Sequence, residues 1–110
     1  MAYDQKLAER VRKLLARRKG LSEIRMFGGL CFTLKGNMCC GVEKERLMVR
    51  VGPERYEEAL AKPHARPMDF TGRPLKGFLF VGPGGYKTEP SLRKWVSMSA
   101  DFASSLPPKR

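Results

Sequence analysis

Hydrophobic residues near the N-terminus recur every three or four positions, which is the period of an amphipathic helix. The residues on this spacing are Tyr3, Leu7, Val11, Leu14 and Leu15. Gly20 comes after the last turn and is typical of a helix C-terminus. The pattern therefore predicts a helix over residues 4–19.

Between residues 22 and 51 the hydrophobic period changes to two, which is typical of half-buried strands. The runs predict four strands, over residues 24–27, 30–34, 38–42 and 47–51. The connections Lys35-Gly36-Asn37 and Lys44-Glu45 are short enough for hairpins. Neighbouring strands are therefore expected to run antiparallel.

The C-terminal half adds two predicted helices, over residues 53–61 and 91–106, and two predicted strands, over 68–70 and 77–81. Thr88 is placed to cap the last helix. The element order α-β-β-β-β-α-β-β-α predicts an α+β fold with two layers, a mostly antiparallel sheet and helices packed on one face. The lack of βαβ alternation argues against Rossmann and P-loop folds.

The loop after Leu34 decides which side chains of a hairpin share a face, because a shift of one residue turns every side chain over. A two-residue loop, Gly36-Asn37, would pair Leu34 with Cys39 and divide the apolar residues between both faces. A three-residue loop over residues 35–37 pairs Leu34 with Met38 and gathers them on one face. We therefore predict the three-residue loop, ending on Asn37 in the left-handed conformation.

In that register Cys40 lies beneath the helices and Val42 pairs with Leu47, whereas Cys31 and Cys39 lie on the reverse face of the sheet. This reverse face carries small or soft side chains that could meet a second subunit. We predict a homodimer, with contacts from Cys31, Thr33, Cys39, Met48 and Arg50.

The composition indicates one folded domain over residues 1–110. A hydrophobic fraction of 42 % is sufficient for a packed core and excludes wholesale disorder. No apolar run approaches the roughly 18 residues that span a bilayer, so no membrane partner is expected. Charged residues occur within the first few positions, where a signal peptide would have an apolar stretch, so we expect a cytoplasmic protein.

The chain is strongly basic, with 22 lysines and arginines against 11 acidic residues and a net charge of +11. Part of this charge forms a stripe along the first predicted helix, at Lys6, Arg10, Lys13 and Arg17. Such a stripe could contact the phosphates of a nucleic acid without reading its sequence. The stripe is also typical of the solvated face of a surface helix, which is the interpretation we favour.

Cysteine and histidine offer little for catalysis or metal binding. The three cysteines, Cys31, Cys39 and Cys40, are an odd number and are expected to be reduced. Adjacent residues of a strand point to opposite faces, so Cys39 and Cys40 should not bind one ion without a bulge. His64 is the one available base, in a proline-flanked loop. Residues 82–88 end in Lys-Thr but lack the glycine spacing of a phosphate-binding loop. We predict no catalytic residue, no metal and no cofactor.

Several segments carry a resemblance to a known family. They are 25–29 (RMFGG), Phe32, 36–42 (GNMCCGV), 47–52 (LMVRVG) and 66–74 (RPMDFTGRP) before a GFLFV strand. Together they resemble the TfoX N-terminal domain family over almost the whole chain, about residues 3–108. The resemblance implies a small α+β fold that is often dimeric, without enzymatic activity. It also implies a link to TfoX/Sxy regulators of natural competence, the uptake of DNA in transformation.

The longer regulators append a C-terminal helical domain, which we do not expect here. The sequence and the resemblance together predict a non-enzymatic regulatory or binding domain that acts as a homodimer or through a protein regulator partner. The alternative is a basic nucleic-acid-binding module that contacts phosphates nonspecifically through its first helix. A third interpretation, of a different class, is an enzyme that uses Cys39 or Cys40.

Overall fold

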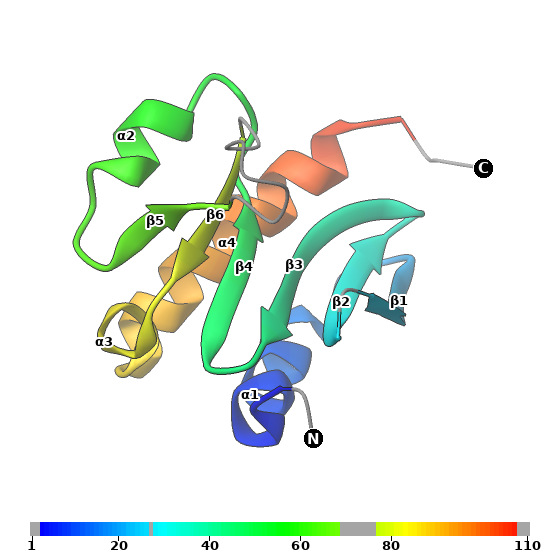
Figure 1. Ribbon diagram of the computed structural model, residues 1–110. Coiled ribbons are helices and arrows are strands. Elements are labelled where there is room, and N and C mark those ends of the chain that lie inside the picture. The colour runs from blue at the N-terminus through cyan, green and yellow to red at the C-terminus, as the bar shows by residue number, and fades with distance from the viewer. Residues whose placement is uncertain (1–2, 27, 69–76, 108–110) are drawn as a thin grey trace.

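The computed structural model describes residues 3–26, 28–68 and 77–107. Figure 1 shows a six-stranded sheet with α1 and α4 packed behind it. The strands are β1 (Leu21–Met26), β2 (Gly29–Leu34), β3 (Asn37–Glu43), β4 (Arg46–Arg50), β5 (Ala65–Pro67) and β6 (Phe78–Val81). They are arranged in the order β1-β2-β3-β4-β6-β5, and each neighbouring pair is antiparallel. The predicted α+β fold is confirmed.

The helices are α1 (Gln5–Leu15), α2 (Tyr56–Leu60), α3 (Pro83–Tyr86) and α4 (Glu89–Ser105). Asp4 caps α1, because its side chain accepts hydrogen bonds from two backbone N–H groups of the first turn. Thr88 caps α4 by accepting from the backbone N–H of Ser91, as predicted. The predicted element order is found, with the short α3 added where the sequence predicted only a turn. Among the described residues, no helix is long and apolar enough to cross a membrane.

Several element boundaries differ from the prediction, including those of β1, which begins three residues earlier. Helix α1 ends at Leu15 rather than at residue 19, because the chain turns through residues 16–20 to a left-handed Gly20. Helix α2 begins three residues later than predicted. Strand β5 covers residues 65–67, where Ala65 pairs with Val81. It therefore ends before the strand that was predicted over residues 68–70. Residues 69–70 lie outside the described residues.

The main core lies between the sheet and the two long helices. Buried apolar side chains of α1 and α4 meet those of β2, β3, β4 and β6, which confirms the helical and alternating patterns of the sequence. Its largest fully buried members are Leu7, Val11, Leu15, Phe32, Leu34, Val42, Leu47, Val49, Leu79 and Leu92. This face of the sheet is called the helix face below.

The predicted three-residue loop is wrong. Leu34 pairs with Asn37, so the loop contains only Lys35 and Gly36, both with positive φ (52° and 84°). A β-bulge restores the rest of the predicted register, since Phe32 pairs with Cys40 and Leu30 with Val42. The predicted pairing of Val42 with Leu47 is also confirmed.

The bulge changes the placement of two side chains. Cys39 is the extra residue of the bulge, since Cys40 pairs with Phe32 and Met38 with Thr33. Cys39 therefore joins Cys40 in the main core, and its predicted place on the reverse face is wrong. Met38, predicted on the helix face, packs instead against the reverse-face cluster. Cys40 lies beneath the helices, as predicted.

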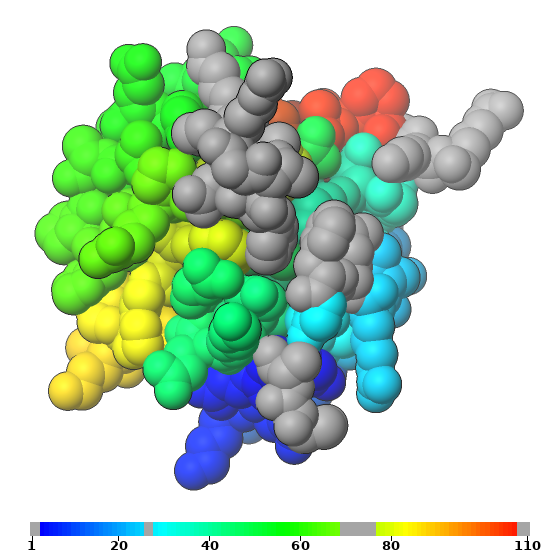
Figure 2. Space-filling model, in the orientation of Figure 1, coloured from blue at the N-terminus to red at the C-terminus, as the bar shows by residue number. Residues whose placement is uncertain are grey.

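The reverse face carries a second, smaller core within the single chain. Figure 2 shows the molecule from this side, with β4 in green and β6 in yellow. Cys31, Met48, Met68 and Phe80 are all at most 3 % exposed and form one cluster. Of the residues predicted to contact a second subunit, Cys31, Cys39 and Met48 are thus buried inside the chain, Thr33 is 7 % exposed, and Arg50 is half-buried. Dimerisation itself stays a prediction.

Candidate functional site

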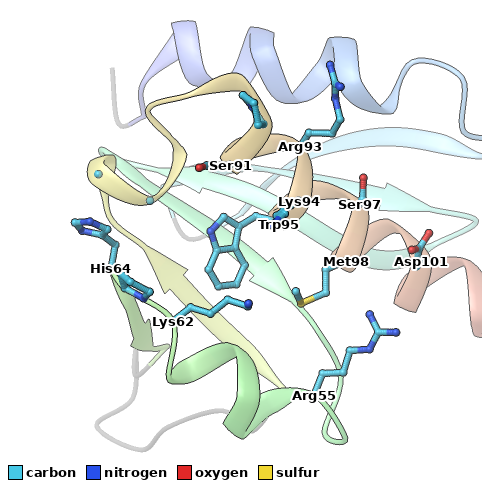
Figure 3. Close-up of a pocket in the computed structure, with 14 residues that line it drawn as sticks. Arg55, Lys62, His64, Ser91, Arg93, Lys94, Trp95, Ser97, Met98 and Asp101 are labelled. Carbon is cyan, nitrogen blue, oxygen red and sulfur yellow. The ribbon is translucent and has the colours of Figure 1, made fainter.

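A groove of about 920 Å³ runs between α4 and the segment that follows α2. We call it the basic groove, and its lining includes Arg55, Lys62, His64, Arg93, Lys94 and Trp95. Figure 3 shows the Trp95 indole directed from α4 into the groove, where Lys62 reaches in from the opposite wall. Three separate parts of the chain therefore meet at this site.

Helix α4 forms one wall because of its amphipathic pattern. Arg93 and Lys94 are exposed, whereas Leu92 and Trp95 on either side of them are buried against the sheet. The Thr88 cap fixes where the helix begins, and hence which residues face outward. Trp95 is 5 % exposed, so it forms part of the groove floor rather than a free aromatic platform.

The opposite wall depends on an unusual backbone at His64, whose φ is +69°. The His64 carbonyl accepts a hydrogen bond from the backbone N–H of Gly82 at 3.0 Å. The imidazole packs directly against Gly84, where a Cβ atom would clash with the ring. Gly84 and Gly85 thus allow close packing of this wall.

Most of the charged side chains that line the basic groove are positive. Among the described residues, Arg55, Lys62, Arg93 and Lys94 form no ion pair. The carboxylate that lines the groove, Asp101, is already paired with Arg18 outside it, at 3.1 Å. Several cations around one concave surface, without matching anions, create a local positive potential.

The predicted stripe on α1 is less uniform than its spacing suggests. Lys6 and Lys13 are exposed on the helix, and Arg17 is exposed beyond its end. Arg10 is half-buried and forms an ion pair with Glu89 of α4 at 3.3 Å. One of the four predicted phosphate contacts therefore holds α1 to α4.

A neighbouring cation of α1 is also engaged within the fold. Arg12 donates two hydrogen bonds to Glu23 of β1, at 2.6 and 2.9 Å, and a third to Glu9. The hydrogen bonds from Arg12 lower the pKa of Glu23 below its usual range. Part of the positive charge of this segment thus ties the helix to the sheet.

The three cysteines are free thiols, all buried. The hydrogen bond with Cys39, together with burial, raises the pKa of Cys40, and burial raises that of Cys31. Thiols in such surroundings stay protonated at neutral pH and are poor nucleophiles. Cys39 and Cys40 were predicted to lie on opposite faces of the sheet because they are adjacent in a strand. The bulge places both in the main core, so this prediction is wrong. Even so, no cluster of three or more metal-binding side chains occurs in the described part of the chain.

Sequence reasoning missed the basic groove and pointed to α1 instead. The exposed pair Arg93-Lys94 on an amphipathic helix was the available signal. Nothing in the one-dimensional pattern, however, indicated that Arg55 and Lys62 would line the same groove as that pair. The site is a product of tertiary packing between α2, the segment after it and α4.

Comparisons with known proteins give one match. A family model described as the TfoX N-terminal domain matches residues 13–103, which include most of α4 and the described sheet. No curated protein and no solved structure matches the chain.

Proposed function

The chain belongs to the TfoX N-terminal domain family, and from that premise we propose that it is a non-enzymatic regulatory domain that binds an acidic segment of a protein partner in the basic groove. The family name supports a regulatory role connected with natural competence. The buried, protonated thiols support binding rather than nucleophilic catalysis.

One observation carries the proposal: four cations, which form no ion pair within the described part of the chain, line a single groove of about 920 Å³. Their mutual repulsion is relieved when an anionic partner enters, which favours association and speeds it at low salt. Lys94 comes from α4, and Arg55 and Lys62 come from the opposite wall, whereas the Arg93 side chain points away from Trp95 (Figure 3).

The groove floor favours a polypeptide over a nucleic acid. Half-buried Met98, which also lines the groove, contributes apolar surface that an aliphatic side chain of a peptide can cover. Binding of unpaired bases commonly uses an aromatic face that is open for stacking. The indole of Trp95 is too covered to offer one. An acidic segment with an interspersed apolar residue matches both the charge and the floor.

The nucleic-acid alternative has one specific observation in its favour. Lys6, Lys13 and Arg17 are exposed, and none of them forms an ion pair among the described residues. They could track a phosphate backbone without entering the groove. This second candidate predicts a different set of sensitive residues, so one pair of variants separates the two.

The test compares two variants that each remove four positive charges. The groove variant carries Arg55→Gln, Lys62→Gln, Arg93→Gln and Lys94→Gln. The matched control carries Lys6→Gln, Lys13→Gln, Arg17→Gln and Lys19→Gln, which are also exposed. Binding of a fluorescein-labelled glutamate-rich peptide with a central leucine, and of duplex DNA, is measured by anisotropy at several salt concentrations.

The groove variant should lose peptide affinity by at least about tenfold, whereas the control should stay within about threefold of the wild type. Equal loss in both variants would indicate only a general charge effect and would contradict the groove assignment. DNA binding that is lost in the control variant and retained in the groove variant would favour the nucleic-acid module instead.

A further inference from the structure

The two edges of the sheet differ in how open they are to a further strand. Strand β5 has only three residues and ends in Pro67, and both features discourage pairing. Strand β1 at the other edge has six residues, without proline. Among the described residues, β2 is the one strand that pairs with β1, so its outer side is open (Figure 1).

The hydrogen bonds of the hairpins identify the free backbone groups of this edge. Lys35 donates its backbone N–H to the carbonyl of Gly20 at 2.9 Å, so Gly20 faces β2. Backbone groups alternate in direction along a strand. Ser22 and Ile24 therefore also face β2, whereas Leu21, Glu23 and Arg25 direct their N–H and C=O groups outward.

The side chains of β1 are unusual for a protected edge. Ile24 is 44 % exposed and is the one large hydrophobic side chain that is exposed in the described part of the chain. It lies on the reverse face, beside its partner Cys31. Glu23 and Arg25, of opposite charge, are also exposed and lie on the helix face, opposite Phe32 and Leu30. The Glu23 carboxylate already accepts two hydrogen bonds from Arg12 of the same chain, so an arginine of a second copy would share it.

We propose that β1 pairs antiparallel with β1 of a second copy of this chain, about a two-fold axis at Ile24. In this register Glu23 of each copy is opposite Arg25 of the other, and the two Ile24 side chains meet. Glu23 and Arg25 form the hydrogen-bonded pairs, because their backbone groups face outward. The Ile24 pair takes the non-hydrogen-bonded position, where side chains approach most closely.

The neighbouring two-fold registers are unfavourable. An axis at Glu23 places two carboxylates directly opposite each other, and an axis at Arg25 does the same with two guanidinium groups. Only the axis at Ile24 combines opposed charges with apolar contact. The edge is therefore self-complementary, as a two-fold interface requires.

The assembly would join two six-stranded sheets into one continuous sheet. The basic groove lies beside α2, which packs against β5 and β6 at the far end of the strand order. Both grooves of the dimer therefore stay open. A partner with two acidic segments could bind both at once, which raises its apparent affinity without any new contact. The dimer does not depend on the groove function, so each can fail separately.

The register is tested by charge reversal and mixing, measured by sedimentation velocity. Arg25→Glu places glutamate opposite Glu23, and Glu23→Arg places arginine opposite Arg25, so each variant alone should dimerise at least about tenfold more weakly than the wild type. Because Glu23→Arg also breaks the contact with Arg12, the comparison with the mixture, in which that contact is equally broken, isolates the effect of the opposed charges. A mixture of the two restores both opposed pairs and should form heterodimers with affinity within about threefold of the wild type. Arg66→Glu, on the other edge strand, is the matched control and should dimerise normally.

Circular dichroism spectra of all three variants verify that the chains are folded. A wild-type chain that is monomeric at about 1 mM would overturn the proposal. Dimerisation of Arg25→Glu at wild-type strength, or folded variants that do not combine when mixed, would overturn it as well. None of these results would bear on peptide binding in the basic groove.

Discussion

Replacing Gly41 with alanine tests whether the reverse face of the sheet is filled from within the chain. Gly41 lies on β3 and pairs with Cys31 on one side and Met48 on the other. A Cβ atom at this position would lie 2.7 Å from the carbonyl oxygen of Leu30 and 2.7 Å from Cε of Met48. The Met48 methyl can turn aside, but the Leu30 carbonyl belongs to the adjacent strand and cannot move without shifting the ladder.

The expected magnitude follows from two opposing effects. Overpacking a well-filled site typically costs about 1–3 kcal/mol of the free energy of unfolding. Alanine recovers about 0.4–1 kcal/mol, because it restricts the unfolded chain more than glycine does. The net destabilisation should be about 1–2 kcal/mol. For a domain of this size each kcal/mol lowers the melting temperature by roughly 4–8 °C.

The assay is urea unfolding followed by circular dichroism, with Gly82→Ala as the matched control. At Gly82 the nearest neighbour of an added Cβ is the His64 carbonyl oxygen at 4.0 Å, so no clash arises. This control should change the free energy of unfolding by no more than about 0.5 kcal/mol. If Gly41→Ala is as neutral as Gly82→Ala, the close approach of the Leu30 carbonyl to Gly41 is refuted.

Three further predictions concern the thiols, a buried hydroxyl and an ion pair. Burial raises the pKa of Cys31, and the hydrogen bond with Cys39 together with burial raises that of Cys40. Ionisation of the unfolded chain should therefore lower the free energy of unfolding as pH rises above about 8.5, measured by urea titrations across that range. Tyr86→Phe removes a 2.5 Å hydrogen bond to the Glu45 carbonyl and should cost about 0.5–1.5 kcal/mol in the same assay. Arg12→Ala should cost at most about 1 kcal/mol, with the difference shrinking in high salt, because the contact with Glu23 is partly exposed. A cost of several kcal/mol at Arg12 would contradict this view of α1.

The sequence was sufficient for the fold because its periodic patterns are local. The spacing of Leu7, Val11 and Leu15 predicts α1, and the Val42–Leu47 pairing follows from a two-residue turn. The loop at residues 35–37 was misjudged for a physical reason. One surplus residue can be placed in the turn or in a bulge, and both choices give the same pairing of Phe32 with Cys40.

The choice between turn and bulge depends on contacts that are distant in sequence. The Asn37 side chain donates to the carbonyl of Pro107 at 2.8 Å, which fixes Asn37 inside β3 rather than in the loop. The basic groove was hidden for a similar reason. Arg55 and Lys62 look like ordinary surface charges until α2 and the segment after it pack beside α4.

The fluorescence of Trp95 tests the central claim most directly, because it is the one tryptophan of the chain and lies in the floor of the basic groove. Titration with the unlabelled acidic peptide should change its emission in a saturable way. The midpoint should match the anisotropy titration, and the groove variant should show no change over the same range. Peptide binding that saturates in the wild type without any change in Trp95 emission would place the partner elsewhere and contradict the account.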